Sequence, residues 1–183
     1  AHEAGYRVSE DLAVIDKIIE VCNLDWLNSP AVSVPPGLPD RTPVFIVGLP
    51  RTGTTLVERI LGAHSRVESL DETTYLPLAI RQAGGRQGGG AMDPGIIEVA
   101  AQAEPALIAR SYLDFVEYRL GSSPLFIEKL PENILYLGYI ARSFPRAKIV
   151  HLQRHPMDAC FAMYKQSYFR FAYSLDDIGQ YYL

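Results

Sequence analysis

The sequence has little of what marks a disulfide-stabilised, metal-binding or membrane-spanning protein. Cys22 and Cys160 are its only cysteines, too few for a disulfide framework and without the CxxC spacing of a metal site. No apolar run approaches the roughly 20 residues that a membrane helix needs. Since two isolated cysteines favour a reducing compartment, we expect a cytoplasmic rather than a secreted or luminal location.

An excess of basic charge is also absent. The chain has 17 Lys and Arg against 21 Asp and Glu, a formal net charge of -4. This balance would not draw it to nucleic acid or to an anionic membrane, so any anion site has to be local. What it has is 183 residues, 48% of them hydrophobic, which suits one globular domain with a sizeable core. The chain starts without Met and stops within a pattern, so we expect a fragment.

The N-terminal part differs in pattern from the rest. Residues 9–22 have apolar side chains at helical spacing, with Ser9 as the predicted N-cap. Five prolines then follow between Pro30 and Pro43, which predicts an extended connector. We therefore divide the chain into an N-terminal helix with a Pro-rich connector, residues 1–40, and a cofactor-binding domain, residues 41–183, that is incomplete at its C-terminus.

Short apolar segments and helical patterns alternate through the second part. Strands are expected at 44–48, 65–70, 124–130 and 147–153, the last of them buried. Helices are expected at 53–63, from Asp71 onward, within 95–120, at 131–144 and from Pro156 onward. This alternation predicts an α/β fold with a doubly wound, mainly parallel sheet, which binds ligands at the carboxyl ends of its strands. The Gly-rich segment 84–95 fits either a lid or a plain surface loop.

One loop has the form of a phosphate-binding loop (P-loop) without its lysine. Residues 48–55, GLPRTGTT, fit the frame G-x-x-x-x-G-x-[ST] between a predicted strand and a predicted helix. Backbone N–H groups and the helix N-terminus would hold a phosphate there. Gly53 permits a close approach, and Thr52, Thr54 and Thr55 add hydroxyl donors. A simple structural turn is the alternative.

The missing lysine changes the chemistry expected at this loop. Thr54 replaces the lysine that reaches the β- and γ-phosphates in nucleoside-triphosphate enzymes, and Gln153 and Arg154 end a later strand where an acidic magnesium ligand would stand. Arg51 lies inside the loop and offers a planar, fork-shaped cation instead. This suits a ligand whose transferable group carries less charge than a γ-phosphoryl group, handled without a metal.

These two segments together resemble a known family. The stretches VFIVGLPRTGTTLVERIL and KIVHLQRHPMDACFAMYKQSYF, about a hundred residues apart, are similar to the two cofactor motifs of sulfotransferases, which use 3′-phosphoadenosine 5′-phosphosulfate. The variant R-[ST]-G-T-T is most similar to tyrosylprotein sulfotransferases and to bacterial sulfotransferases that follow tetratricopeptide repeats. The resemblance spans roughly residues 42–170.

The resemblance implies a role for particular residues. Residues 51–55, which include Arg51 and Thr55, would bind the 5′-phosphosulfate, and Arg154 would bind the 3′-phosphate. Glu72, in DETTYLP, matches the catalytic glutamate of the tyrosylprotein branch. Lys129, in FIEKLPEN, matches a lysine at the end of a core strand. The nucleotide would be the co-substrate, with no metal.

The residues taken alone leave other interpretations open. Glu72 is placed near a predicted helix start, where an acidic side chain also serves as a cap. Lys129 could be a solvated lysine at a strand end, or contact the cofactor at the edge where ligands collect. Arg154 could form a surface salt bridge, or serve an anion site at the N-terminus of the helix led by Pro156.

The match to the family is incomplete. Its second motif usually has a serine eight residues after the arginine, and Ala162 stands there, so one hydrogen bond to a charged group, worth on the order of 1.5 to 3 kcal/mol, is absent. The family's pattern also continues beyond Leu183. We therefore expect a sulfotransferase acting on a hydroxyl of a protein tyrosine, a carbohydrate or a small molecule. A nucleotide kinase and a non-catalytic nucleotide-binding module are the alternatives, and the sequence does not indicate an oligomeric state.

Overall fold

A four-stranded parallel sheet forms the centre of the computed structural model, which describes residues 6–31, 41–85, 94–166 and 169–183. The strands are β1 (Thr42–Gly48), β2 (Val67–Ser69), β3 (Leu125–Lys129) and β4 (Lys148–Leu152), in the spatial order β2-β3-β1-β4. Strand β1 pairs in parallel with both β3 and β4. The predicted strands are therefore confirmed. Most of the Gly-rich segment 84–95, namely residues 86–93, lies outside the described residues.

Helices connect the strands, and several open on a proline. Pro94, Pro105, Pro131 and Pro156 each begin a helical segment, where the missing N–H costs nothing. Along the chain the helices are α1 (Val8–Val21), α2 (Leu24–Asn28), α3 (Thr54–Gly62), α4 (Tyr75–Ala83), α5 (Pro94–Ala101), α6 (Pro105–Val116), α7 (Leu137–Ser143), α8 (Pro156–Tyr164) and α9 (Leu175–Tyr182), with 3-10 turns η1 (Glu117–Arg119), η2 (Pro131–Tyr136) and η3 (Arg170–Tyr173).

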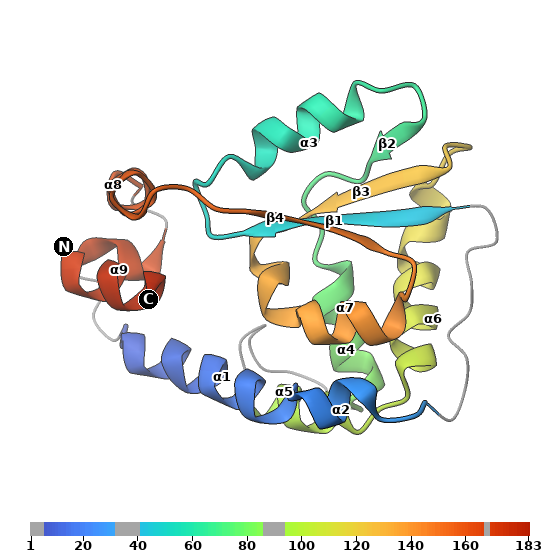
Figure 1. Cartoon of the computed structure of the whole chain (residues 1–183), viewed down its shortest axis with the longest axis horizontal. Coiled ribbons are helices and arrows are strands. Elements are labelled where there is room, and N and C mark those ends of the chain that lie inside the picture. Colours follow the sequence, from blue (N-terminus) through green and yellow to red (C-terminus); the bar gives the residue numbers. More distant parts are fainter. Residues whose placement is uncertain (1–5, 32–40, 86–93, 167–168) are drawn as a thin grey trace.

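The two faces of the sheet are covered by different helices, and successive side chains of β1 point alternately to one face and to the other. Val44 and Ile46 belong to a cluster with Ile127 of β3, against which Val57 of α3 packs. Phe45 and Val47 face the larger core, which contains Tyr112 and other side chains of α4, α6 and α7. Figure 1 shows α3 on one side of the sheet and α4, α6 and α7 on the other. The predicted doubly wound α/β architecture is confirmed.

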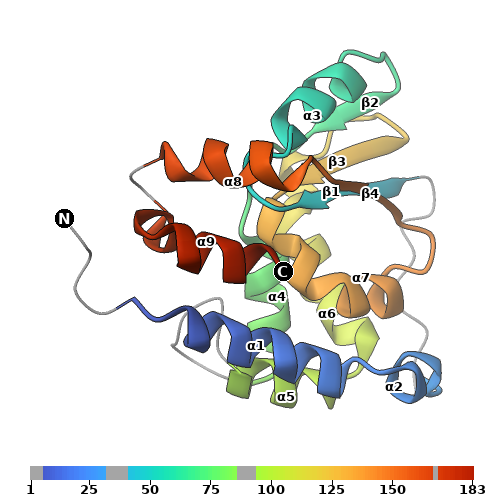
Figure 2. The ribbon, with the colours of Figure 1, turned by 60° about the vertical axis from the view of Figure 1, so that its left-hand side comes forward.

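The N-terminal helix α1 packs against the rest of the molecule. Val14 is 3% exposed and belongs to the larger core. The helix contacts α5 and α9, beside which it lies in Figure 2. The prediction that Ser9 is the N-cap is wrong, because the helix already begins at Val8 and Arg7 has the extended cap conformation. In the part of the chain that the structure describes, no helix is both long and apolar enough to cross a bilayer.

Two further expectations about local structure are corrected. The strand expected to be buried, β4, lies at the edge of the described sheet and pairs with β1 alone, so Ile149 is 42% exposed. The helix expected from Asp71 begins only at Tyr75. Asp71 has a left-handed backbone, with φ of 60°, which interrupts any helix at that point.

Candidate active site

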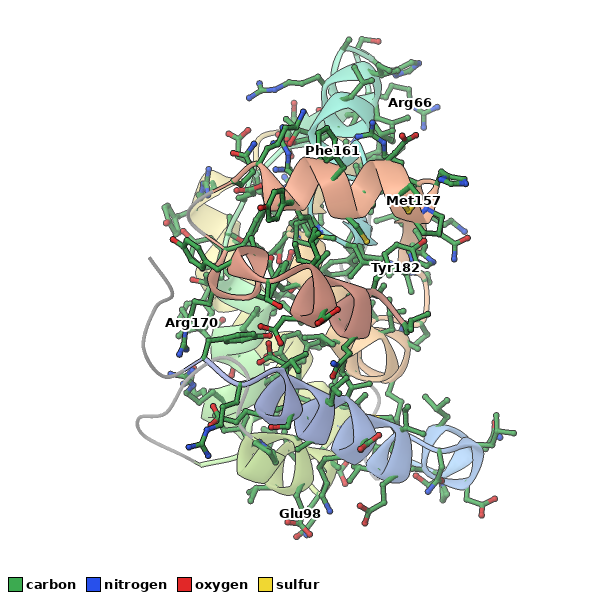
Figure 3. The ribbon with its side chains drawn as sticks, turned by 90° about the vertical axis from the view of Figure 1, so that its left-hand side faces the viewer. Arg66, Glu98, Met157, Phe161, Arg170 and Tyr182 are labelled. Carbon is green, nitrogen blue, oxygen red and sulfur yellow. The ribbon has the colours of Figure 1, made fainter. Side chains whose placement is uncertain are left out.

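The predicted site residues converge at the carboxyl ends of the strands, which lie on the same side of a parallel sheet. The loop after β1 contains Arg51, Lys129 is the last residue of β3, and Arg154 follows β4. Helices α8 and α9 lie in front of these strand ends in Figure 3. Met157 and Phe161 are on α8, and Tyr182 is on α9. Tyr182 donates a hydrogen bond of 3.2 Å from its hydroxyl to the Arg154 carbonyl.

Backbone geometry gives the loop after β1 its shape. Gly48 has φ of 153°, and a Cβ atom there would lie 2.6 Å from the Leu152 carbonyl oxygen of β4. Gly53, immediately before α3, has φ of 103°, a conformation that L side chains rarely adopt. Arg51 also has a left-handed backbone, with φ of 65°. The Thr52 hydroxyl donates to the Leu49 carbonyl at 2.7 Å, so this threonine braces the loop internally.

The loop and the helix after it form an anion cradle flanked by two guanidinium groups. Thr54 and Thr55 begin α3, whose first N–H groups and positive dipole end point toward the loop. Arg154 donates from Nη1 to the Arg51 carbonyl oxygen at 3.1 Å, although the two residues are 103 positions apart. The cavity here is lined by Arg51, Thr52, Gly53, Thr54, Thr55, Leu56 and Arg154.

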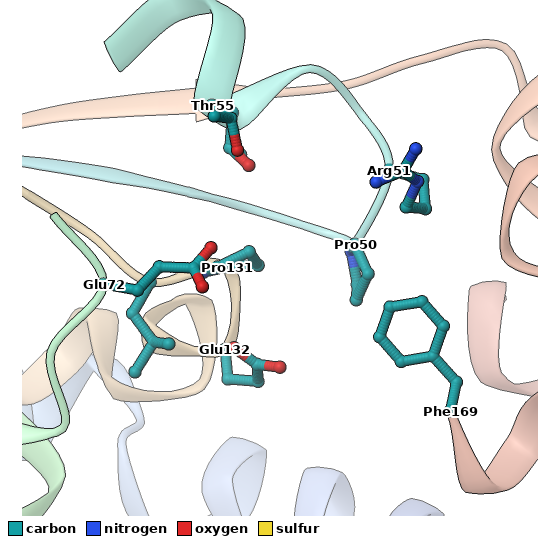
Figure 4. A pocket seen from close by; sticks show the side chains of 9 residues that line it. Pro50, Arg51, Thr55, Glu72, Pro131, Glu132 and Phe169 are labelled. Atoms are coloured by element: carbon teal, nitrogen blue, oxygen red, sulfur yellow. The ribbon is translucent and has the colours of Figure 1, made fainter. Parts of the chain in front are cut away.

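A second cavity shares the loop and leads to Glu72. Its lining residues are Pro50, Arg51, Thr54, Thr55, Glu72, Leu130, Pro131, Glu132 and Phe169. In Figure 4 the Glu72 carboxylate points into this cavity, Thr55 lies above it and the Phe169 ring lies across the opening. Arg51 and the two threonines line both cavities. An anion bound at the loop would therefore border the space in front of Glu72.

Glu72 forms an ion pair with Lys129. Its side chain is 58% exposed, whereas that of Lys129 is 4% exposed, so Lys129 is not the solvated strand-end lysine of the alternative interpretation. Glu72 also lies outside α4, whose N-cap residue is Thr74, which removes the helix-capping interpretation. The left-handed turn at Asp71 instead directs the next residue toward the end of β3, where the Lys129 N–H donates to the Asp71 carbonyl at 3.3 Å.

Arg154 also makes a weak contact with the first turn of α8. Its Nε atom lies 4.0 Å from a carboxylate oxygen of Asp158, in a pair that is about half exposed. An exposed pair at this distance contributes little to stability. The surface salt bridge of the alternative interpretation thus exists, but the same guanidinium also bonds the phosphate-binding loop.

The sequence patterns missed a buried carboxylate behind the site. Glu58 of α3 is 2% exposed, and its Oε2 atom lies 3.6 Å from Lys129 Nζ. Ser69 donates to Glu58 Oε1 at 2.5 Å. The available signal was spacing, because Glu58 follows Thr54 by four residues and so shares its helix face. Glu132 was missed too, since nothing local relates it to the loop.

The charged groups near the loop are guanidinium, ammonium and carboxylate side chains. No group of three or more His, Cys, Asp or Glu residues in the described part of the chain is arranged to hold a metal ion. The groups that are present can bind an anion and accept a proton.

Comparison with known proteins relates this chain to sulfotransferases. The model of the sulfotransferase family matches residues 43–182. An uncharacterized protein of Aquifex aeolicus (strain VF5) is 35% identical over 136 residues, 72% of this chain and 18% of that protein. Protein-tyrosine sulfotransferase 2 of Gallus gallus is 31% identical over 113 residues, 61% of this chain and 30% of that protein. Protein-tyrosine sulfotransferase 1 of Danio rerio is 30% identical over 117 residues, 63% of this chain and 33% of that protein.

The chain spans about a fifth to a third of the length of these curated relatives. The family match nevertheless covers most of the residues here, including the loop at Arg51, Glu72, Lys129 and Arg154. By this match and by its parallel α/β sheet, the chain belongs to the sulfotransferase family.

Proposed function

We propose that this chain forms the nucleotide-binding and proton-accepting part of a sulfotransferase that uses 3′-phosphoadenosine 5′-phosphosulfate and a hydroxyl acceptor. The observation that carries the proposal is the shared wall of two cavities. Arg51, Thr54 and Thr55 line both the anion cradle and the space in front of Glu72. A group bound at the loop would therefore border a carboxylate able to accept a proton.

The residues present fit the two anionic ends of such a nucleotide. Residues 51–55 would hold the 5′-phosphosulfate through backbone N–H groups, the Thr54 and Thr55 hydroxyls and the Arg51 guanidinium. Arg154 lies across the same cradle, with its Nη1 atom on the loop, and would hold the 3′-phosphate. Ala162 of α8 supplies no hydroxyl there, so the 3′-phosphate would depend more heavily on Arg154.

The proposed sulfuryl transfer would take place in the space between the phosphate-binding loop and Glu72. The acceptor oxygen attacks sulfur, an S–O bond forms to the acceptor and the S–O bond to the 5′-phosphate breaks. The hydroxyl proton passes to Glu72, and 3′-phosphoadenosine 5′-phosphate departs with the bonding electron pair. Arg51 and Lys129 would stabilise the charge on the sulfuryl oxygens and on the leaving phosphate.

The cleft in front of Glu72 gives the acceptor an apolar wall with one added carboxylate. Pro50, Leu130, Pro131 and Phe169 line it together with Glu132. Such a wall accepts the ring of a tyrosine, a sugar face or a small alcohol. We propose an acceptor of one of these three kinds, without choosing among them.

Calorimetric titration tests the proposal. The desulfated product 3′-phosphoadenosine 5′-phosphate is titrated into the wild-type chain and into Arg51→Ala and Arg154→Ala, with magnesium and ATP as the competing ligand. We expect product binding that weakens at least about tenfold in each variant, because each loses a charge-assisted contact. Tighter binding of magnesium and ATP would favour the kinase alternative instead.

A transfer assay distinguishes the enzyme from a module that only binds nucleotide. Sulfuryl transfer from the labelled nucleotide is followed with a tyrosine peptide, an oligosaccharide and a simple phenol. Transfer that is lost in Glu72→Gln supports the proposed base, whereas unchanged turnover in that variant contradicts it. Product binding without transfer to any acceptor would favour the non-catalytic module.

A further inference from the structure

Glu58 is a buried carboxylate that the proposed chemistry does not use. It lies within α3, one turn beyond Thr54, and 2% of its side chain is exposed. It lines neither of the two cavities at the loop, so it has no access to the nucleotide or to the acceptor. A carboxylate removed from water needs charged or hydrogen-bonding partners to remain ionised.

The partners of Glu58 are parts of the candidate site. Lys129 Nζ lies 3.6 Å from its Oε2 atom, and Ser69 donates to its Oε1 atom at 2.5 Å. The Asp71 N–H in turn donates to Ser69 Oγ at 3.0 Å. Glu58 therefore contacts the lysine directly and the turn before Glu72 through one serine.

Two carboxylates share one ammonium group in this arrangement. Lys129 pairs with exposed Glu72 on one side and with buried Glu58 on the other. The ammonium group and the proton of the acceptor compete for the Glu72 carboxylate, whose Oε1 atom pairs with the lysine, so Glu72 is a better base once the lysine releases it. A lysine with 4% of its side chain exposed would then need another negative partner, because water cannot solvate it.

We propose that Glu58 is a positioning residue that holds Lys129 beside the phosphate-binding loop and so releases Glu72 to act as the base. This inference rests on the proposed function. With nucleotide bound, Lys129 lies between Glu58 and the anionic sulfuryl and phosphate oxygens, and Glu72 faces the acceptor. The placement is rigid because α3 also carries Thr54, four residues before Glu58 on the same face.

The test compares turnover and affinity in a double-mutant cycle. We expect Glu58→Gln to lower kcat by about 10- to 100-fold and to change the KM for the nucleotide by less than about threefold, since Glu58 touches no substrate. Glu58→Asp keeps the charge and is expected to recover part of kcat. In a Lys129→Met background, Glu58→Gln is expected to change kcat by less than about twofold, because the residue it acts through is already missing.

Controls separate this role from general destabilisation and from a wrong function. Glu98→Gln, at an exposed position of α5 far from the site (Figure 3), is the control and should keep wild-type kcat. Urea unfolding of the cycle checks that every variant is folded. The positioning role would be overturned if Glu58→Gln lowered kcat equally in the wild-type and Lys129→Met backgrounds. It would also be overturned if kcat of Glu58→Asp were no higher than that of Glu58→Gln. A wild type that binds product but transfers nothing would instead overturn the proposed function, and the positioning role with it.

Discussion

Single residues with unusual backbone geometry shape the phosphate-binding loop. Arg51 and Asp71 are the described non-glycine residues with positive φ, at 65° and 60°, and both adjoin the candidate site. Left-handed backbone costs a non-glycine residue on the order of 1 kcal/mol or more, so such residues persist where the surrounding structure fixes them. Their positions, directly at Arg51 and one residue before Glu72, link this strain to two of the proposed site residues.

Gly48 is the glycine whose replacement should be felt most. In Gly48→Ala the new Cβ atom would lie 2.6 Å from the Leu152 carbonyl oxygen and 3.1 Å from Thr52 Oγ1. Neither the backbone of β4 nor the braced threonine can move aside without cost. We expect the free energy of unfolding to fall by about 2 to 4 kcal/mol, measured by urea denaturation. Gly179→Ala, where nothing lies within 4 Å, is the control. Equal stability of the two variants would contradict this account of the loop.

At the scale of elements, the 3-10 turn η2 presents one side of a helical turn to the core and the other to the cleft. Asn133 is fully buried and donates to Glu128 Oε1 at 2.9 Å. The preceding residue, Glu132, is exposed and lines the cavity in front of Glu72. The buried asparagine thus fixes the place of a carboxylate beside the proposed acceptor position.

The charge of Glu132 should affect which acceptors are used. Together with the anionic nucleotide it would repel a negatively charged acceptor. We expect Glu132→Gln to raise kcat/KM for an acceptor with a carboxylate near its hydroxyl by about 3- to 10-fold, and to change that of a neutral analogue by less than about twofold. Competition between the two acceptors measures the ratio, and product titration checks that nucleotide affinity is unchanged. The same ratio in wild type and variant would contradict the effect.

The positions of the helices and strands could largely be predicted from the sequence, but which of them lie side by side could not. Runs such as residues 44–48 and 125–129 indicate strands, and the prolines at the helix starts mark boundaries. Strand order depends on contacts far apart in sequence, so the edge position of β4 was missed. Helical spacing likewise places Glu58 beside Thr54 but gives no sign of the lysine that it meets on β3.

The candidate site could be predicted where a motif spans it. The loop at residues 48–55 and Arg154 belong to two local patterns, and the structure brings them together. Glu72 and Lys129 were found by resemblance, and their ion pair was not foreseen because the left-handed turn at Asp71 has no clear sequence signature.

At the scale of the whole molecule, one buried acid ties stability to pH. Glu128 of β3 is fully buried in the larger core side of the sheet, and burial raises its pKa to about 7. The hydrogen bond from Asn133 and the charge of Arg119 favour the ionised form and offset part of this effect. Folded protein therefore holds the Glu128 proton to higher pH than unfolded protein does.

The sign of the effect follows from proton linkage. Between the ordinary glutamate pKa of about 4.5 and the folded value of about 7, the folded state binds more protons, so stability falls as pH rises. We expect the contribution to be on the order of 3 kcal/mol over that range. Urea denaturation of the wild type and Glu128→Gln at several pH values measures it, because the variant should lack this slope. Parallel pH dependence of the two proteins would exclude Glu128 as its source.

Helix α3 also limits which substitutions, insertions and deletions this sequence can tolerate in evolution. Its outward side chain Ile60 is 62% exposed and lines neither cavity at the loop, so substitutions there should be tolerated. A change in length is different, because each residue added to a helix rotates all later residues by about 100° around the helix axis. One inserted residue between Thr54 and Glu58 would carry the carboxylate away from Lys129 while leaving the phosphate-binding loop intact. Exposed residues of α3 can therefore vary in evolution, but an insertion or deletion in its first turn would separate the proposed nucleotide binding from the proposed catalysis.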